Sequence, residues 1–359
     1  MPASPGDRAN KPAKRSVPLW QRHLAGAVSS LGELVDRLDL QMSDLAPTDV
    51  APPEVPGTVD ATTEAERDFP LRVPRGFVDR MRRGDPRDPL LLQVLPTAAE
   101  TLSVAGYSRD PLAEERAGAT PGLLHKYRGR VLLVVTGACA IHCRYCFRRH
   151  FPYGDHSLWG DAWHEAVHYV ASDPSLHEVI LSGGDPLVLT DDKLARLGAA
   201  LEAIPHLRRL RLHTRLPIVL PERVDDNLLA WLTSSRLQPV VVVHANHPNE
   251  IDTNVQSAFA RLRSAGITLL NQTVLLAGIN DDAATLCELS EALFAAGALP
   301  YYLHLPDPVS GTAHFAVDDT SGQRLLAEMM RRLPGYLVPR LVREDPNTPA
   351  KRPVGPLGL

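Results

Sequence analysis

The chain has 359 residues, of which 44% are hydrophobic, so it can bury a large core in one main domain with an appendage. Its formal charge of -4 gives no basic field for nucleic acid, and no apolar run approaches the roughly 18 residues of a membrane span. The N-terminus is polar and Pro-rich and lacks the apolar stretch of a secretory signal, which predicts a cytoplasmic protein.

The first 68 residues are predicted to form a helical appendage and a linker. Apolar side chains recur at helical spacing over residues 18–40, which predicts one or two amphipathic helices. Residues 46–66 are rich in Pro, Thr and Ala and predict an extended linker. The pattern of residues 69–129 is mixed, and we expect a helical lead-in whose short helices end at prolines.

From residue 130 onward, short apolar runs alternate with helical patterns. Strands that are apolar throughout, with a helix between each pair, predict an α/β fold with a parallel sheet covered by helices. Six such units favour a partial (β/α)6 barrel over residues 130–343 more than a flat sheet, although periodicity leaves open whether the barrel closes. The predicted strands are 130–136, 178–183, 208–214, 239–246, 268–276 and 301–305, and the helical patterns are 159–172, 191–204, 224–235, 254–266 and 282–297.

Three cysteines stand directly after the first of these strands, where a barrel places its reactive groups. Cys139, Cys143 and Cys146 have the spacing C-x3-C-x2-C, which in a reducing compartment indicates metal or redox chemistry rather than disulfides. Three thiolates on one loop can hold three irons of a 4Fe-4S cluster and leave the fourth iron open. A zinc site is the alternative. His142 could join it, but Cys287 lies in a distant helical pattern.

The cysteine spacing resembles the signature of radical S-adenosylmethionine (SAM) enzymes. The resemblance implies that SAM binds the open iron and is cleaved to a 5′-deoxyadenosyl radical. The motif "SGGDP" after the second strand resembles the family's site for the SAM amino group. In this reading Gly183 and Gly184 permit close backbone approach, and Asp185 accepts from the ammonium. An ordinary Gly-Gly-Asp turn is the alternative.

The resemblance assigns three further polar residues to the SAM side. Arg144 lies inside the cysteine loop and is expected to brace the cluster or the SAM carboxylate. His244 and Gln272 stand at the ends of two later strands and match residues that line the SAM site. For His244 the alternative is a structural histidine of the barrel.

Several longer stretches resemble one group of radical SAM enzymes. "CRYCFRRHFPY", "HANHPNEI" and "YYLHLPDPVSGTAHF" are similar to the lysine 2,3-aminomutase family, and "LRVPRGFVDRM" and "GYLVPRLVRE" are most like its bacterial branch that makes (R)-β-lysine for elongation factor P. The resemblance runs from about residue 69 to 351 and implies an isomerase that moves an amino group from C2 to C3 of L-lysine. It also implies a functional link to a lysyl-transferring ligase and an electron donor such as flavodoxin or ferredoxin.

Members of this family use pyridoxal 5′-phosphate beside the cluster, so the resemblance implies a lysine that binds its aldehyde. Lys351 stands in the matching Lys-x-Pro context of a C-terminal tail, residues 344–359. By composition alone Lys351 would be a solvated tail lysine. Arg148 and Arg130 match the family's phosphate-side arginines, and Lys126 and Tyr127 stand in neighbouring cofactor-contact positions.

The family's substrate site implies two carboxylates for the distal ammonium of lysine. Asp307 and Glu344 match these positions, and a buried ammonium needs such partners. A glutamate substrate would instead require neutral or basic side chains. Three alternatives remain at this level: an aminomutase that supplies a β-amino acid to secondary metabolism, a non-catalytic iron-sulfur sensor, and a zinc-binding module. The oligomeric state is left open.

Overall fold

The computed structural model describes residues 17–45, 59–154, 158, 162–346 and 348–358. Most of the predicted linker and the first residues of the helical pattern at 159–172 lie outside these ranges. The description therefore begins at the first amphipathic helix and includes every residue assigned above to the site.

Ten strands form one sheet in chain order, from β1 to β10. The six central strands are parallel neighbours, which confirms the predicted α/β fold and the six predicted strands. Among the described residues β1 and β10 do not pair, so the barrel is partial. The strands are β1 (Gly118–Thr120), β2 (Leu123–Tyr127), β3 (Arg130–Thr136), β4 (Glu178–Gly183), β5 (Arg209–Thr214), β6 (Gln238–His244), β7 (Thr268–Val274), β8 (Leu299–His304), β9 (Arg340–Arg343) and β10 (Arg352–Pro353).

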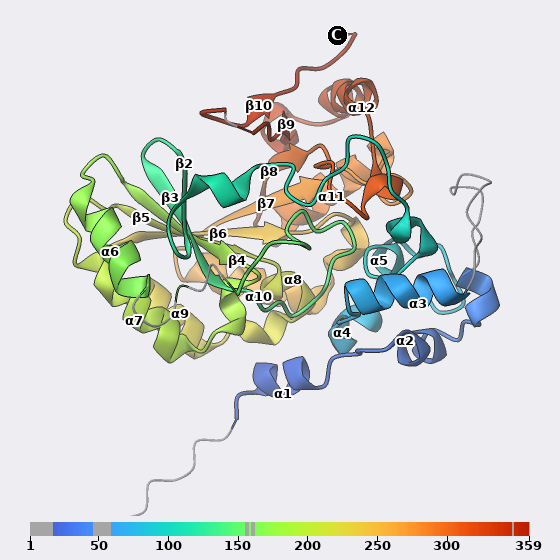
Figure 1. Cartoon of the computed structure of the whole chain (residues 1–359), viewed down its shortest axis with the longest axis horizontal. Coiled ribbons are helices and arrows are strands. Elements are labelled where there is room, and N and C mark those ends of the chain that lie inside the picture. Colours follow the sequence, from blue (N-terminus) through green and yellow to red (C-terminus); the bar gives the residue numbers. More distant parts are fainter. Residues whose placement is uncertain (1–16, 46–58, 155–157, 159–161, 347, 359) are drawn as a thin grey trace, which may run out of the picture.

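Helices join the parallel strands and lie around the outside of the sheet (Figure 1). Several begin at an aspartate whose carboxylate accepts from the backbone N–H three residues on, as Asp225, Asp252 and Asp282 do. No described helix is long and apolar enough to cross a membrane. The helices after β3 are α6 (Ala162–Ser172), α7 (Asp191–Glu202), α8 (Leu216–Val219), α9 (Asp226–Ser234), α10 (Thr253–Ser264), α11 (Ala283–Ala296) and α12 (Asp319–Arg332).

The N-terminal helices pack beside the barrel rather than apart from it (Figure 1). Trp20, Leu34 and Phe77 are buried in the same hydrophobic core cluster as the strands. The two helices predicted within residues 18–40 are confirmed as α1 and α2. The helices before the barrel are α1 (Leu19–Ala25), α2 (Leu31–Arg37), α3 (Val59–Asp68), α4 (Arg75–Val78) and α5 (Pro89–Leu92).

The prediction of an extended linker over residues 46–66 is wrong at its C-terminal end. Helix α3 (Val59–Asp68) occupies that part of the chain, and Ala65 is buried. The carbonyl of Ala65 accepts a hydrogen bond at 3.0 Å from Nη2 of Arg144, which belongs to the cysteine loop. A tertiary contact of this kind stabilises the helix, and composition does not reveal it.

Candidate active site at the C-terminal ends of the strands

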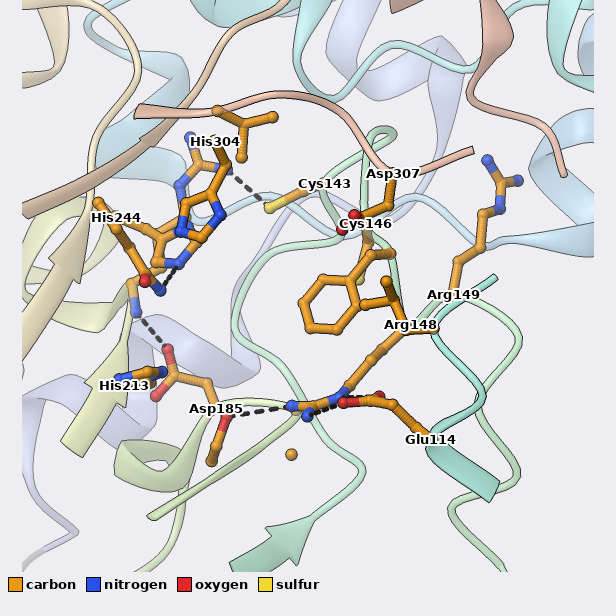
Figure 2. A pocket seen from close by; sticks show the side chains of 18 of the residues that line it. Glu114, Cys143, Cys146, Arg148, Arg149, Asp185, His213, His244, His304 and Asp307 are labelled. Carbon is orange, nitrogen blue, oxygen red and sulfur yellow. Dashed lines mark hydrogen bonds and ion pairs between the residues drawn. The ribbon is translucent and has the colours of Figure 1, made fainter. Parts of the chain in front are cut away.

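A cavity of about 700 Å³ opens at the C-terminal ends of the parallel strands (Figure 2). Its wall brings together residues that are far apart in the sequence, from the end of α3 to the segment before β10. Among the described residues, the predicted site residues that line it are Lys126, Tyr127, Arg130, Cys139, Cys143, Cys146, Arg148, Gly183, Gly184, Asp185, His244, Gln272, Asp307, Glu344 and Lys351.

The three cysteines lie on a loop that is tied to the N-terminal lead-in by backbone contacts. The N–H of Arg144 donates to the carbonyl of Gln93 at 2.9 Å, and the N–H of His142 donates to that of Arg72 at 2.9 Å. Nδ1 of His142 lies 2.7 Å from the carbonyl oxygen of Pro70. One ring nitrogen of His142 is therefore already engaged by the backbone.

The three cysteines are half-buried, and their thiols are close enough to influence one another. Burial and the neighbouring thiols raise the pKa of Cys139 well above its usual range, and burial together with Cys143 raises the pKa of Cys146 to about 11. Binding of a metal to these thiols therefore has to displace protons. Among the described residues, no group of three or more His, Cys, Asp or Glu side chains is spaced to hold a single metal ion.

Arg144, predicted to brace the cluster or the SAM carboxylate, has its guanidinium engaged by other parts of the protein. Its side chain is fully buried and does not line the cavity. Its guanidinium forms an ion pair with Glu100 and donates to the backbone carbonyls of Ala65 and Phe69. Arg144 therefore holds the cysteine loop against the N-terminal helices, because Ala65 and Phe69 belong to α3 and the residue that follows it.

The two glycines of the SGGDP motif lie directly against the backbone of β3 and of the cysteine loop. A Cβ on Gly184 would lie 2.3 Å from the carbonyl oxygen of Ala138, and a Cβ on Gly183, whose φ is +114°, would lie 2.5 Å from that of Thr136. The two glycines thus permit close approach of the cysteine loop to β4. The groups that approach each other here are two segments of the protein's own backbone. The sequence analysis had expected the glycines to permit close approach of SAM.

The carboxylate of Asp185, predicted to accept from the SAM ammonium, is engaged by four donors of the protein itself. It accepts from the hydroxyl of Thr214 at 2.7 Å and from the backbone N–H groups of Leu187, Arg215 and Leu216 at 3.0, 2.7 and 3.2 Å. Burial raises the pKa of Asp185 to about 6 despite these four hydrogen bonds. With both oxygens saturated, Asp185 joins the ends of β4 and β5.

Arg148 is engaged by a carboxylate that the sequence analysis missed. Its Nε and Nη2 donate to the two oxygens of Glu114, both at 2.7 Å, and its Nη1 donates to the hydroxyl of Ser182 at 3.1 Å (Figure 2). Because Glu114 occupies this bidentate face of the guanidinium, an anion in the cavity would have to replace Glu114 or share Arg148 with it. Glu114 lies in a segment without clean periodicity, so no sequence signal pointed to it.

Glu344 and Lys351 form an ion pair in the cavity. Glu344 also accepts from the ammonium of Lys126 at 3.0 Å and from the hydroxyl of Tyr127 at 2.7 Å. Burial alone would raise the pKa of Glu344, but the charges and hydrogen bonds of these partners hold it well below its usual range. Lys351 is therefore a cavity residue and not a solvated tail lysine.

Asp307 follows β8 and lines the same cavity. Burial and the negative charge of Glu344 raise the pKa of Asp307 to about 7. For the part of the chain that the structure describes, no hydrogen bond to the Asp307 carboxylate is recorded. A half-buried carboxylate in this state favours a cation that could approach it.

Three half-buried histidines form part of the cavity wall. His244, at the end of β6, forms a hydrogen bond with Gln272 of β7. Burial lowers the pKa of His244 to about 3, and it lowers those of His213 and His304 well below their usual range. The sequence analysis missed His213 and His304, although both lie at strand ends where the barrel rule could have found them.

Comparison with known proteins identifies the family. Residues 133–289 match the model of the Radical SAM superfamily. The L-lysine 2,3-aminomutase of Escherichia coli (strain K12) is 47% identical over 335 residues, which are 93% of this chain and 94% of that protein. The L-lysine 2,3-aminomutase of Haemophilus influenzae is 44% identical over 341 residues, 95% of this chain and 97% of that protein. The chain belongs to the lysine 2,3-aminomutase family.

Membership of this family confirms the resemblance seen in the motifs and the prediction of an isomerase. It overturns the alternatives of a non-catalytic sensor and a zinc-binding module. Among solved structures, a radical SAM methyltransferase from Sphaerobacter thermophilus is 16% identical, with a TM-score of 0.44 over 62% of this chain and 68% of that chain.

The residues present fit the 4Fe-4S cluster that radical SAM membership implies. Cys139, Cys143 and Cys146 line one cavity, and a guanidinium nitrogen of Arg215 donates to Sγ of Cys143 at 2.7 Å. When bound, the cluster would supply the single electron that cleaves SAM, while these three thiols would hold three of its irons.

Gly184→Ala is expected to displace the cysteine loop, because the new Cβ would meet the carbonyl oxygen of Ala138 at 2.3 Å. We expect a loss of roughly 1–3 kcal/mol in the free energy of unfolding and less iron and sulfide per chain after anaerobic reconstitution. Gly76→Ala in α4 is the matched control, since a Cβ there has no described atom within 4 Å. Equal iron content and stability in Gly184→Ala and the wild type would contradict the role given to Gly184.

Proposed function

We propose that this chain is a pyridoxal phosphate-dependent L-lysine 2,3-aminomutase of the cytoplasm, and that its β-lysine serves the modification of elongation factor P. The observation that carries the proposal is that Lys351, Glu344 and Asp307 line one cavity with the three cysteines. Two carboxylates suit an ammonium, and a reactive amine suits an aldehyde. The printed names of the relatives from Escherichia coli and Haemophilus influenzae support lysine as substrate.

The cavity residues fit pyridoxal phosphate. Lys351 offers an amine for the aldehyde, and Lys126, Arg130 and Arg148 line the same cavity and offer positive charge for the phosphate. The guanidinium of Arg130 lies 4.5 Å from the ring centre of Tyr127, which limits its orientation. When bound, pyridoxal phosphate would supply an aldehyde carbon for amines and a conjugated ring that spreads an unpaired electron.

Glu344 is suited to a substrate ammonium because it already binds two of the chain's own. Lys351 and Lys126 both direct an alkylammonium at its carboxylate. Once the amine of Lys351 is engaged elsewhere, one oxygen of Glu344 becomes available to the distal ammonium of lysine. Asp307 would provide a second negative charge, so the ammonium would be compensated although it is removed from water.

The histidines of the cavity wall limit proton transfer to a bound species. His213, His244 and His304 are neutral at physiological pH because burial lowers their pKa values, so they do not act as proton donors there. A wall of this kind can hold a reactive species away from water without offering it a proton. The chain's own part in the reaction is therefore to orient the substrate by charge and to exclude solvent.

Lys351→Ala is expected to abolish β-lysine formation, because the amine that holds the aldehyde is lost. The measurement is chromatography of products after anaerobic incubation of reconstituted enzyme with SAM, pyridoxal phosphate, dithionite and L-lysine, with the cofactor's absorbance as a second readout. Lys193→Ala in α7 changes a lysine outside the cavity and serves as control. Normal turnover and normal cofactor absorbance in Lys351→Ala would refute the assignment.

Asp307→Asn is expected to raise the KM for L-lysine roughly 10- to 100-fold, because the substrate ammonium loses one charge-assisted contact. Because the pKa of Asp307 is raised to about 7, its negative charge is lost as the pH falls below 7, and the wild type should bind lysine more weakly there. Glu344 stays ionised in this range, since its pKa is held well below the usual value.

The apparent Kd for L-lysine, measured between pH 5.5 and 8.5, should rise toward acid by up to about tenfold per pH unit in the wild type and stay level in Asp307→Asn. Asp226→Asn makes the same chemical change on an exposed side chain of α9 and should leave the wild-type profile intact. If the apparent Kd of the wild type does not change with pH, the ionised carboxylate of Asp307 does not bind the ammonium of lysine.

The fate of the product separates modification of elongation factor P from supply to secondary metabolism. Loss of the encoding gene should remove a β-lysyl mass increment from elongation factor P, measured by mass spectrometry of the purified factor. A gene for the Lys351→Ala variant should fail to restore that mass, whereas a gene for Lys193→Ala should restore it. An unchanged mass of elongation factor P in the deletion strain would favour a metabolite as the destination of β-lysine.

A flavodoxin or ferredoxin would replace dithionite as the electron donor in the cell.

A further inference from the structure

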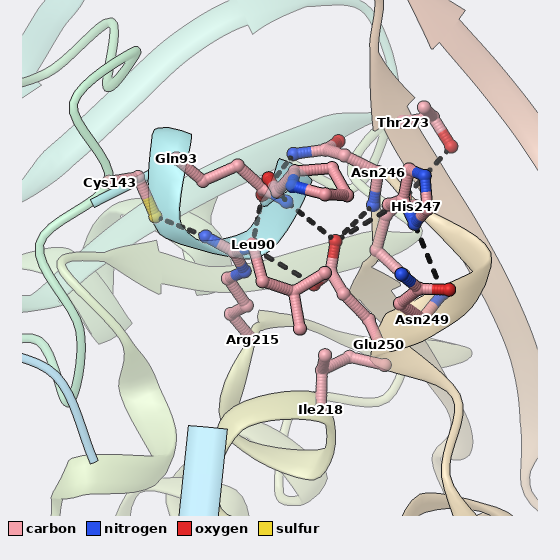
Figure 3. Close-up of polar contacts among 12 residues, drawn as sticks. Leu90, Gln93, Cys143, Arg215, Ile218, Asn246, His247, Asn249, Glu250 and Thr273 are labelled. Atoms are coloured by element: carbon pink, nitrogen blue, oxygen red, sulfur yellow. Dashed lines mark hydrogen bonds and ion pairs between the residues drawn. The ribbon is translucent and has the colours of Figure 1, made fainter. Parts of the chain in front are cut away.

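Arg215 lies against the cysteine loop, although no sequence motif pointed to it. It is the first residue after β5, and its side chain is buried. One guanidinium nitrogen, Nη1, donates to Sγ of Cys143 at 2.7 Å (Figure 3). Cys143 thus receives a hydrogen bond from a fixed cation.

The guanidinium is held from several sides. Its Nη2 donates to Oε1 of Gln93 at 2.6 Å and to Oε2 of Glu250 at 2.9 Å. Its carbon Cζ lies 5.4 Å from the ring centre of Phe77 and 5.7 Å from that of Tyr145. Since α5, η6 (Pro248–Glu250) and the cysteine loop all contribute contacts, the position of the cation is fixed by the fold.

Glu250 anchors this network and has no exposed surface of its own. Its Oε1 accepts from the backbone N–H of Asn246 at 2.8 Å and from Nε2 of Gln93 at 3.2 Å (Figure 3). The side-chain amide of Asn246 in turn donates to the hydroxyl of Tyr145 at 2.7 Å. A buried ion pair is costly unless hydrogen bonds complete it, and here they do.

We propose that Arg215 is a positioning residue for the iron-sulfur cluster, which raises the cluster's reduction potential through its hydrogen bond to the Cys143 thiolate. Reduction adds an electron to the cluster, and a nearby fixed positive charge stabilises the more negative state. The effect is strong because the pair is buried, where charges are poorly screened. The inference rests on the cluster of the proposed function and not on lysine or pyridoxal phosphate.

The test is a redox titration of reconstituted Arg215→Met in the absence of SAM, pyridoxal phosphate and lysine, followed by the electron paramagnetic resonance signal of the reduced cluster. Relative to the wild type, the ratio of reduced to oxidised cluster at a fixed poise should fall about tenfold, which is a potential lower by about 59 mV. Failure of the lysine assay would leave this outcome unaffected, so the two proposals are tested separately.

Arg223→Met is the matched control. Arg223 is also a fully buried arginine with a carboxylate partner, Asp191, but it does not line the cavity. The reduction potential of the cluster in Arg223→Met should equal that in the wild type at equal iron and sulfide content. A potential of Arg215→Met that is unchanged or higher, at full iron and sulfide content, would overturn the proposal.

Arg215→Lys keeps the test decisive if Arg215→Met holds no cluster. A lysine retains the charge but lacks the fork that reaches Cys143, Gln93 and Glu250 together, so its potential should lie below that of the wild type. If Arg215→Lys has the wild-type potential while Arg215→Met cannot be loaded, Arg215 acts in folding and the proposal fails.

Discussion

A carboxylate buried between two guanidinium groups fixes the cysteine loop, and the rest of the site depends on it. Glu100 pairs with Arg144 and Arg149, and the three side chains are 1%, 0% and 3% exposed. Such a cluster is stable only when further hydrogen bonds complete it, and Arg144 supplies them at the carbonyls of Ala65 and Phe69. The loop is therefore held by the protein itself, so the thiols are positioned by the fold before any metal contributes.

The charges of the cavity are balanced internally. Arg148 is matched by Glu114, and Lys351 is matched by Glu344. A ligand with the right charges can exchange with these partners without leaving a buried charge unpaired, whereas a neutral ligand gains nothing from them. For the substrate proposed above, this exchange would contribute to selectivity for an amino acid with a cationic end.

The sequence predicts the parts of the structure that local patterns determine. The six parallel strands and the cysteine loop are found where their apolar runs and spacing place them, because both signals are local. The sequence did not predict helix α3, the protein partners of Arg144 and of the Asp185 carboxylate, or the contact of Arg215 with Cys143. Each depends on a residue more than 25 positions away, and no periodicity reports such a contact.

The open sheet also has consequences for association between copies of the protein. A sheet that does not close leaves two edges, and long exposed edges invite pairing with another chain. Here the outermost strands have three residues in β1 and two in β10, and β10 ends at Pro353, which has no backbone N–H. The barrel is thus open, but its two edge strands have few unpaired backbone groups with which another chain could pair.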